Sequence, residues 1–232
     1  MTTGEVQGPA RRPRTSRGPR SDALRNRRKL LEAVSKILRT NPEALGMPTV
    51  AEAAGLSVAT AYRYFTSLEE LLTSYMRGVV VELRDYSHDC PEAGTALFEK
   101  VVVHWVGQLK VHGPAMIQLR SRIGFLRRLS ENDDLLLGVR DAWERPIRGV
   151  MRQLGIPDEH FNQALFLHNV LFDPRDVLDL LDTGMAEDEA IDRLVGAFYG
   201  ALQGWTEPKT GQARGRAARG NSSGRRSGTT AS

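Results

Sequence analysis

Residues 47–67 read Met-Pro-Thr-Val-Ala-Glu-Ala-Ala-Gly-Leu-Ser-Val-Ala-Thr-Ala-Tyr-Arg-Tyr-Phe-Thr-Ser. This stretch predicts two short helices joined at Gly55, because glycine adopts without a Cβ penalty the left-handed conformation that ends many helices. Thr49 and Glu52 have the spacing of a capping box, which predicts that Thr49 begins the first helix. Ser57 is placed to cap the second helix. Two short helices joined in this way are typical of a helix-turn-helix DNA-binding unit.

The second of these helices has one apolar face and one mixed face. Ala61 and Phe65 are four residues apart, so both are predicted to turn toward a core. A helix-turn-helix protein places the opposite face in the major groove, where side chains reach bases and phosphates. The predicted DNA contacts on this helix and on the segments before it are Thr49, Ser57, Val58, Ala59, Thr60, Tyr62, Arg63, Tyr64, Arg20 and Arg25.

Residues 49–71 resemble the DNA-binding signature of the TetR family of one-component bacterial transcriptional regulators. The shared features are small residues before Gly55, a Thr-x-Tyr-x-Tyr-Phe run from Thr60 to Phe65, and a serine-capped helix that begins after Ser67. The chain departs from the signature at Leu68, where the family usually has a lysine that resembles a phosphate contact.

The resemblance implies an all-α fold, with an N-terminal three-helix helix-turn-helix DNA-binding domain followed by a helical ligand-binding and dimerisation domain. It also implies a homodimer that binds a double-stranded DNA operator, which symmetry favours being palindromic. The regulator is expected to be a repressor that a small-molecule effector, unidentified from the sequence, releases from its operator.

Charge is distributed unevenly along the chain. Residues 1–40 hold 11 Lys or Arg and 3 acidic residues, residues 206–232 hold 6 and 1, and residues 41–205 hold 15 and 24. Clustered arginine is typical of nucleic-acid binding, although a basic tail can also serve only solubility. Few apolar residues near either end predict disorder there.

The predicted organisation is a disordered basic arm (1–20), a helix-turn-helix DNA-binding domain (21–67), a connecting helix (68–85), a helical ligand-binding and dimerisation domain (86–204) and a disordered basic tail (205–232).

Apolar residues recur with helical spacing throughout the middle of the chain, and no alternating strand pattern competes. A glycine and a proline at positions 113–114 predict a helix end, and Pro146 predicts a kink. The helices predicted outside residues 47–67 run approximately over Ser21–Arg39, Ser67–Met76, Glu92–Val111, Pro114–Arg122, Ser130–Leu154, Asp158–Phe172, Asp173–Gly184 and Glu187–Gln203.

Aromatic and polar side chains on these helices are candidates for an effector pocket, although an aromatic at helical spacing is more often ordinary core. The candidate ligand-binding residues are His104, Trp105, Met116, Phe125, Trp143, Phe166 and His168. Apolar positions on the last two long helices are candidates for a dimer interface. These are Phe161, Leu165, Phe172, Ile191, Leu194 and Phe198.

Composition narrows the remaining classes. Cys90 is the one cysteine, which excludes an internal disulfide and a cysteine-cluster metal site, and we expect no metal and no cofactor. A membrane span needs roughly 18 consecutive apolar residues, and none is found, so we expect a cytoplasmic protein with no membrane partner. An enzyme is not favoured, because no phosphate-binding glycine loop or His-Glu-x-x-His motif occurs. An architectural DNA binder without an effector remains the alternative.

Overall fold

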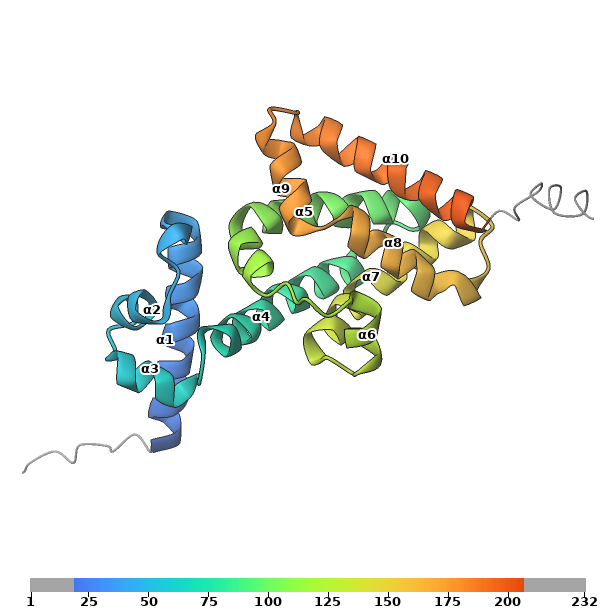
Figure 1. The fold of residues 1–232 in the computed structure, drawn as a ribbon. Helices are drawn as coiled ribbons and strands as arrows, with labels where there is room; N and C mark the ends of the chain where they lie inside the picture. Colours follow the sequence, from blue (N-terminus) through green and yellow to red (C-terminus); the bar gives the residue numbers. More distant parts are fainter. Residues whose placement is uncertain (1–18, 207–232) are drawn as a thin grey trace, which may run out of the picture.

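The computed structural model describes residues 19–206. These residues form ten α-helices and two short 3₁₀ helices and contain no strand, which confirms the all-α fold class. Figure 1 shows a small N-terminal bundle and a larger helical body, joined by one long helix. The disorder predicted for residues 1–20 and 205–232 concerns positions outside this range, except that residues 19–20 and 205–206 are helical.

The N-terminal bundle contains three α-helices around a small apolar core. They are α1 (Pro19–Thr40), α2 (Met47–Ala53) and α3 (Val58–Tyr64), with η1 (Pro42–Ala44) between the first two. α4 (Leu68–Asp89) packs on the bundle with its first turns and then continues into the body. The core of the bundle is made of side chains with no exposed surface, among them Leu30, Val34, Val50, Ala61, Phe65, Leu71 and Leu72.

The turn between α2 and α3 follows the sequence prediction in part. Gly55 has φ +67°, so the glycine ends α2 in the left-handed conformation as expected. The prediction that Thr49 caps α2 is wrong, because the helix begins two residues earlier with Gly46 as its N-cap. Pro48 lies in the first turn, where proline is favoured because its missing N–H would have no partner within the helix.

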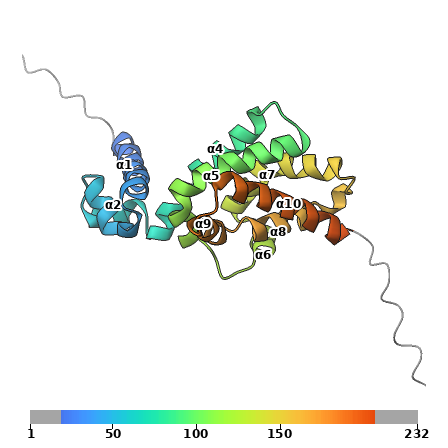
Figure 2. The ribbon, with the colours of Figure 1, turned by 90° about the horizontal axis from the view of Figure 1, so that it is seen from above.

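The body packs its helices around a second core. α5 (Gly94–Gln118) and α7 (Asp134–Gln153) lie alongside α4, and α8 (Phe161–Leu171) packs between α7 and α10 (Glu187–Thr206). The view from above shows α10 on the outside of the body (Figure 2). The shorter elements are α6 (Phe125–Ser130), η2 (Asp158–His160) and α9 (Pro174–Asp182).

Two predicted boundaries in the body are wrong. α5 continues through Pro114 to Gln118. Gly113 serves packing instead of ending the helix, since a Cβ at this position would lie 2.7 Å from the Leu178 side chain of α9. The helix predicted over 130–154 begins four residues later than expected, because the Asp133 side chain accepts hydrogen bonds from two backbone amides and so caps the start of α7. Whether Pro146 kinks α7 stays a prediction.

Two kinds of feature are absent from residues 19–206. None of the helices in this range has the length and apolar character of a membrane span. The same residues include no group of three or more His, Cys, Asp or Glu side chains placed to hold a metal ion.

Candidate nucleic-acid interface and ligand cavity

The start of α3 is fixed by its own hydroxyl groups. The Thr60 backbone N–H donates to Ser57 Oγ at 3.1 Å, and the two side-chain oxygens of these residues lie 2.8 Å apart. Ser57 is therefore the N-cap of α3, as the sequence predicts. Because this bond satisfies a backbone donor with no partner within the helix, it holds the first turn of a seven-residue helix in place.

The outward face of α3 is available to a partner. Val58 is 39% exposed and Tyr62 is 48% exposed, and the neighbouring Ala59 and Arg63 are exposed as well. Arg63 donates to Thr60 Oγ1 at 3.0 Å, which aligns the guanidinium along the helix. A guanidinium can bond two acceptors of guanine in the major groove, and small apolar side chains can contact the methyl group of thymine.

Arg27 of α1 holds α3 from behind. Its guanidinium lies 4.2 Å from the centre of the buried Phe65 ring and donates to Ser74 Oγ on α4 at 3.1 Å. A longer bond of 3.5 Å reaches the Tyr64 carbonyl. Arg27 therefore connects three helices, and its position in an arginine-rich run had not distinguished it from the arginines that face solvent.

The other predicted DNA contacts lie around this helix, and they differ in burial and in the partners that hold their side chains. Tyr64 is half-buried, and its hydroxyl accepts a bond from Asn26 Nδ2 at 3.2 Å. Arg25 pairs with Asp22 at 2.8 Å. Thr49 is half-buried within α2. Arg20 belongs to α1, but its side chain is outside the described part of the structure.

The start of α4 is capped as the sequence predicts. The Glu70 backbone N–H donates to Ser67 Oγ at 3.1 Å. The Glu70 carboxylate in turn accepts bonds from the side chain and the backbone of Thr66, which lower the pKa of this carboxyl. Leu68 is half-buried against the core of the bundle. Leu68 therefore packs against the core, at the position where the family signature usually has a lysine.

A cavity of about 150 Å³ lies in the body, between α4, α5, α7 and α8. Its wall is mainly apolar and includes two tryptophans whose ring centres are 6.4 Å apart. The structure brings together five of the seven predicted ligand residues in this wall, namely Trp105, Met116, Phe125, Trp143 and His168. The other two lie elsewhere, since His104 stacks on Tyr86 and Phe166 contacts Trp205.

Two charged pairs stand at the edge of the cavity. Arg120 bonds Asp173, and Arg128 donates to Asp133 at 2.6 Å. Burial acts to raise the pKa of both carboxyls, but hydrogen bonds and the neighbouring arginines outweigh it and lower the pKa. Both carboxylates are therefore ionised and paired, and Asp173 is shared between Arg120 and the more exposed Arg175.

Two polar side chains in the wall each have one buried atom without a hydrogen-bond partner. Gln108 Nε2 donates to the Val79 carbonyl of α4 at 3.3 Å, whereas Gln108 Oε1 is buried without a donor. His168 Nε2 is also buried without a partner, and burial lowers the pKa of this imidazole to about 3. Sequence reasoning missed Gln108, although a glutamine beside Trp105 and Leu109 on an apolar helix face is a usable signal.

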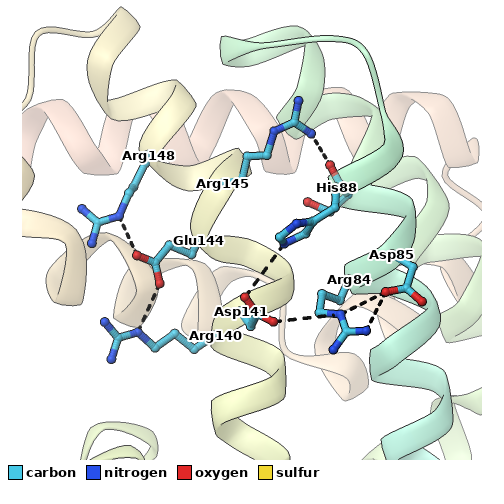
Figure 3. A network of polar contacts seen from close by, with 9 residues as sticks. Arg84, Asp85, His88, Arg140, Asp141, Glu144, Arg145 and Arg148 are labelled. Atoms are coloured by element: carbon cyan, nitrogen blue, oxygen red, sulfur yellow. Dashed lines mark hydrogen bonds and ion pairs between the residues drawn. The ribbon is translucent and has the colours of Figure 1, made fainter.

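A polar network connects α4 with α7 on the other side of the body (Figure 3). Arg145 of α7 donates to three backbone carbonyls around the end of α4, those of Ser87, Cys90 and Glu92. Asp141 lies 3.9 Å from His88 and 4.0 Å from Arg84. Because α7 also lines the cavity, this network fixes the far end of α4 to a cavity wall.

Comparison with known proteins addresses the N-terminal bundle directly. Residues 29–75, which span most of α1 through the first turns of α4, match the family model of bacterial regulatory proteins of the tetR family. The chain carries a TetR-family DNA-binding domain. It is accordingly a DNA-binding transcriptional regulator with an all-α, two-domain fold, as the resemblance at residues 49–71 implied.

Two solved structures align with most of the chain at low sequence identity. A protein from Mesorhizobium loti MAFF303099, assigned to the TetR-family transcriptional regulators, is 13% identical with a TM-score of 0.44, over 79% of this chain and 97% of the other. The flavonoid-responsive regulator FrrA is 21% identical with a TM-score of 0.37, over 80% and 98%. No curated protein sequence matches the chain.

The predicted dimer residues are mostly buried inside one chain. Five of the six side chains, all except Leu194, have 7% or less of their surface exposed and belong to the core of the body. They are Phe161, Leu165, Phe172, Ile191 and Phe198. α8 and α10 bury these side chains against each other and against α5 and α7, which leaves little of their surface for a second copy, and their assignment to an interface stays a prediction.

Proposed function

We propose that this chain is a transcriptional repressor that binds a palindromic operator as a homodimer and leaves it when a small molecule fills the cavity of the body. The observation that carries the proposal is the position of α4. One helix of 22 residues contributes Leu71 and Leu72 to the core behind the reader helix α3, and Val79 and Leu83 to the cavity wall.

Sequence-specific binding follows from the exposed face of α3. Val58, Ala59, Tyr62 and Arg63 form a short surface that fits the major groove, and Thr60 positions Arg63. Ser57 is occupied as a cap and Tyr64 is held by Asn26, so we assign both to positioning and phosphate contact. Thr49, Arg20 and Arg25 stay candidates for phosphate contacts beside the reader helix.

The exposed faces of α8 and α10 support a homodimer better than the residues chosen from the sequence. Val170 is 50% exposed and Trp205 is 54% exposed, and Trp205 lies 6.2 Å from the Phe166 ring. Leu194 is half-buried on the same helix as the exposed Ala197. We define the outer α8–α10 face as Phe166, Val170, Leu194, Ala197 and Trp205, and propose that two copies pair through it with twofold symmetry.

Release by a ligand follows from the two attachments of α4. Gln108 bonds the Val79 carbonyl beside the cavity, and Tyr75 bonds His112 Nδ1 at 2.9 Å nearer the bundle. A molecule that enters the cavity displaces side chains on α4, and the same helix carries part of the reader core. Ligand binding and DNA binding then favour different positions of α4, which is the requirement for coupling between two sites.

Selection from a pool of random DNA duplexes tests the regulator against the architectural alternative. The full-length chain is mixed with the pool, and retained duplexes are amplified and sequenced over several rounds. We expect enrichment of a twofold-symmetric sequence with half-sites about one helical turn, roughly 34 Å, apart. An architectural binder with basic ends retains all duplexes alike, so a pool that stays random after selection contradicts the proposal.

A further inference from the structure

The cavity of the body has a size and a polarity that together define a class of ligand. Its volume is about 150 Å³, which is the size of cavity that holds one benzene ring. Two of its wall residues are Trp105 and Trp143, which supply flat aromatic surfaces. These features favour a single aromatic ring over an elongated or branched molecule.

The orientation of the Gln108 amide leaves one acceptor free. The Val79 carbonyl can only accept a hydrogen bond, so the amide nitrogen of Gln108 must face it. Gln108 Oε1 is then the unpaired atom, and the side chain as a whole is only 7% exposed. A buried acceptor without a donor lowers stability, and a ligand that brings a donor recovers that free energy.

The charged groups around the cavity already have partners, which favours a neutral ligand. Arg128 is paired with Asp133, and Arg120 shares Asp173 with the more exposed Arg175, so each of these guanidinium groups has a carboxylate partner before any ligand arrives. His168 is deeply buried among Trp143 and Phe172 and carries no charge near neutral pH. A carboxylate would also bring further acceptors beside Gln108 Oε1, which has no proton to donate.

We propose that the cavity binds a neutral, single-ring aromatic compound with a hydroxyl group, a phenol, whose O–H donates to Gln108 Oε1. The assignment rests on the proposed function, in that it names the effector class of the ligand-responsive regulator. Trp105, Trp143 and Phe172 surround the ring, and His168 Nε2 offers a second polar atom in the same wall.

Calorimetric titration of the DNA-free, full-length protein with phenol, toluene, anisole and benzoate tests this assignment. Phenol and toluene differ by a hydroxyl in place of a methyl group, and anisole keeps the oxygen without its proton. We expect saturable phenol binding, with anisole weaker by about tenfold or more and no binding of benzoate. Equal binding of phenol and anisole, tighter binding of benzoate, or no binding of phenol would each overturn the assignment.

Gln108→Leu locates the hydrogen bond. The ratio of the toluene Kd to the phenol Kd should fall by about tenfold or more in this variant, because the acceptor is lost while the apolar wall remains. Gln118→Leu is the matched control, with the same substitution at an exposed position of α5 outside the cavity wall, and the ratio should not change. A ratio that Gln108→Leu leaves unchanged places the phenol elsewhere.

These titrations are separable from the test of the regulator. The phenol series is measured without DNA, so failure of phenol to bind removes the ligand class and leaves operator selection unaffected. A selection that enriches no sequence removes the proposed function even if phenol binds. If Gln108→Leu does not fold, the comparison of phenol with anisole on the unmodified chain still decides the assignment.

Discussion

At the scale of single residues, Arg63 is the side chain best placed to read a base. It is exposed on α3 and held only by Thr60, whereas Arg27 is used in packing behind the helix. Arg63→Ala should therefore weaken binding to the selected operator by about 1–3 kcal/mol and reduce the preference over random DNA. Arg127→Ala is the control, an equally charged change on exposed α6 of the body. Equal losses on operator and random DNA would show that Arg63 contacts only phosphate.

His168 gives the body a defined pH dependence. Its folded pKa is about 3 because of burial, below the value near 6.5 of an exposed histidine. As the pH falls below about 6.5, the unfolded chain gains a proton that the folded chain excludes, so stability present at neutral pH is lost toward pH 3.

Chemical unfolding at two pH values measures this effect. Between about pH 7.5 and about pH 5, the unmodified chain should lose about 2 kcal/mol more of its unfolding free energy than His168→Leu does. The comparison removes the contribution of the carboxylates, which both proteins share. If the two proteins lose the same free energy over this interval, His168 is accessible to protons in the folded state.

At the scale of elements, only one of two hydroxyl residues that were predicted to cap a helix does so. Ser57 accepts the Thr60 N–H at the start of α3, whereas Thr49 lies within α2 and caps nothing. Ser57→Ala should lower the unfolding free energy of the bundle by about 1 kcal/mol, and Thr49→Ala should change it by less than about half of that. Thermal unfolding without DNA makes the comparison. A larger loss from Thr49→Ala would restore the capping box.

What the sequence could predict at this scale depended on whether a signal was local. The Ser57 and Ser67 caps and the Gly55 turn are set by neighbouring residues, and the structure has them where the sequence placed them. Gly113 and Pro114 carried the same local signal, but α5 continues through them because α9 packs against the glycine. Long-range packing of this kind leaves no mark in the local pattern.

In the candidate sites, too, a local pattern predicts part of the arrangement and long-range packing decides the rest. The apolar period of α8 and α10 correctly marked the faces that are buried, but a period does not say which surface covers them. Phe198 is covered within its own chain, whereas Val170, which was not among the interface candidates, is exposed. Five ligand candidates meet in one cavity because α5, α6, α7 and α8 converge there, and only the fold brings Gln108 beside Val79.

At the scale of the whole molecule, the outer α8–α10 face is the proposed contact between two copies. Val170→Glu should place an unpaired charge in that contact and yield monomers, with loss of operator binding. Val81→Glu, at an exposed position of α4 outside the outer α8–α10 face, is the matched control and should stay dimeric. Light scattering gives the mass of each variant. A Val170→Glu protein with the mass of a dimer would place the contact elsewhere.

A regulator must distinguish one DNA sequence from others. The direct measurement is the ratio of two dissociation constants in the same salt, one for the selected operator and one for a duplex of equal length with both half-sites scrambled. A regulator should bind the operator about 10³-fold tighter or more, since base contacts add to the charge attraction that any duplex provides. A ratio near one would show that the chain binds DNA through charge alone, and would contradict the account.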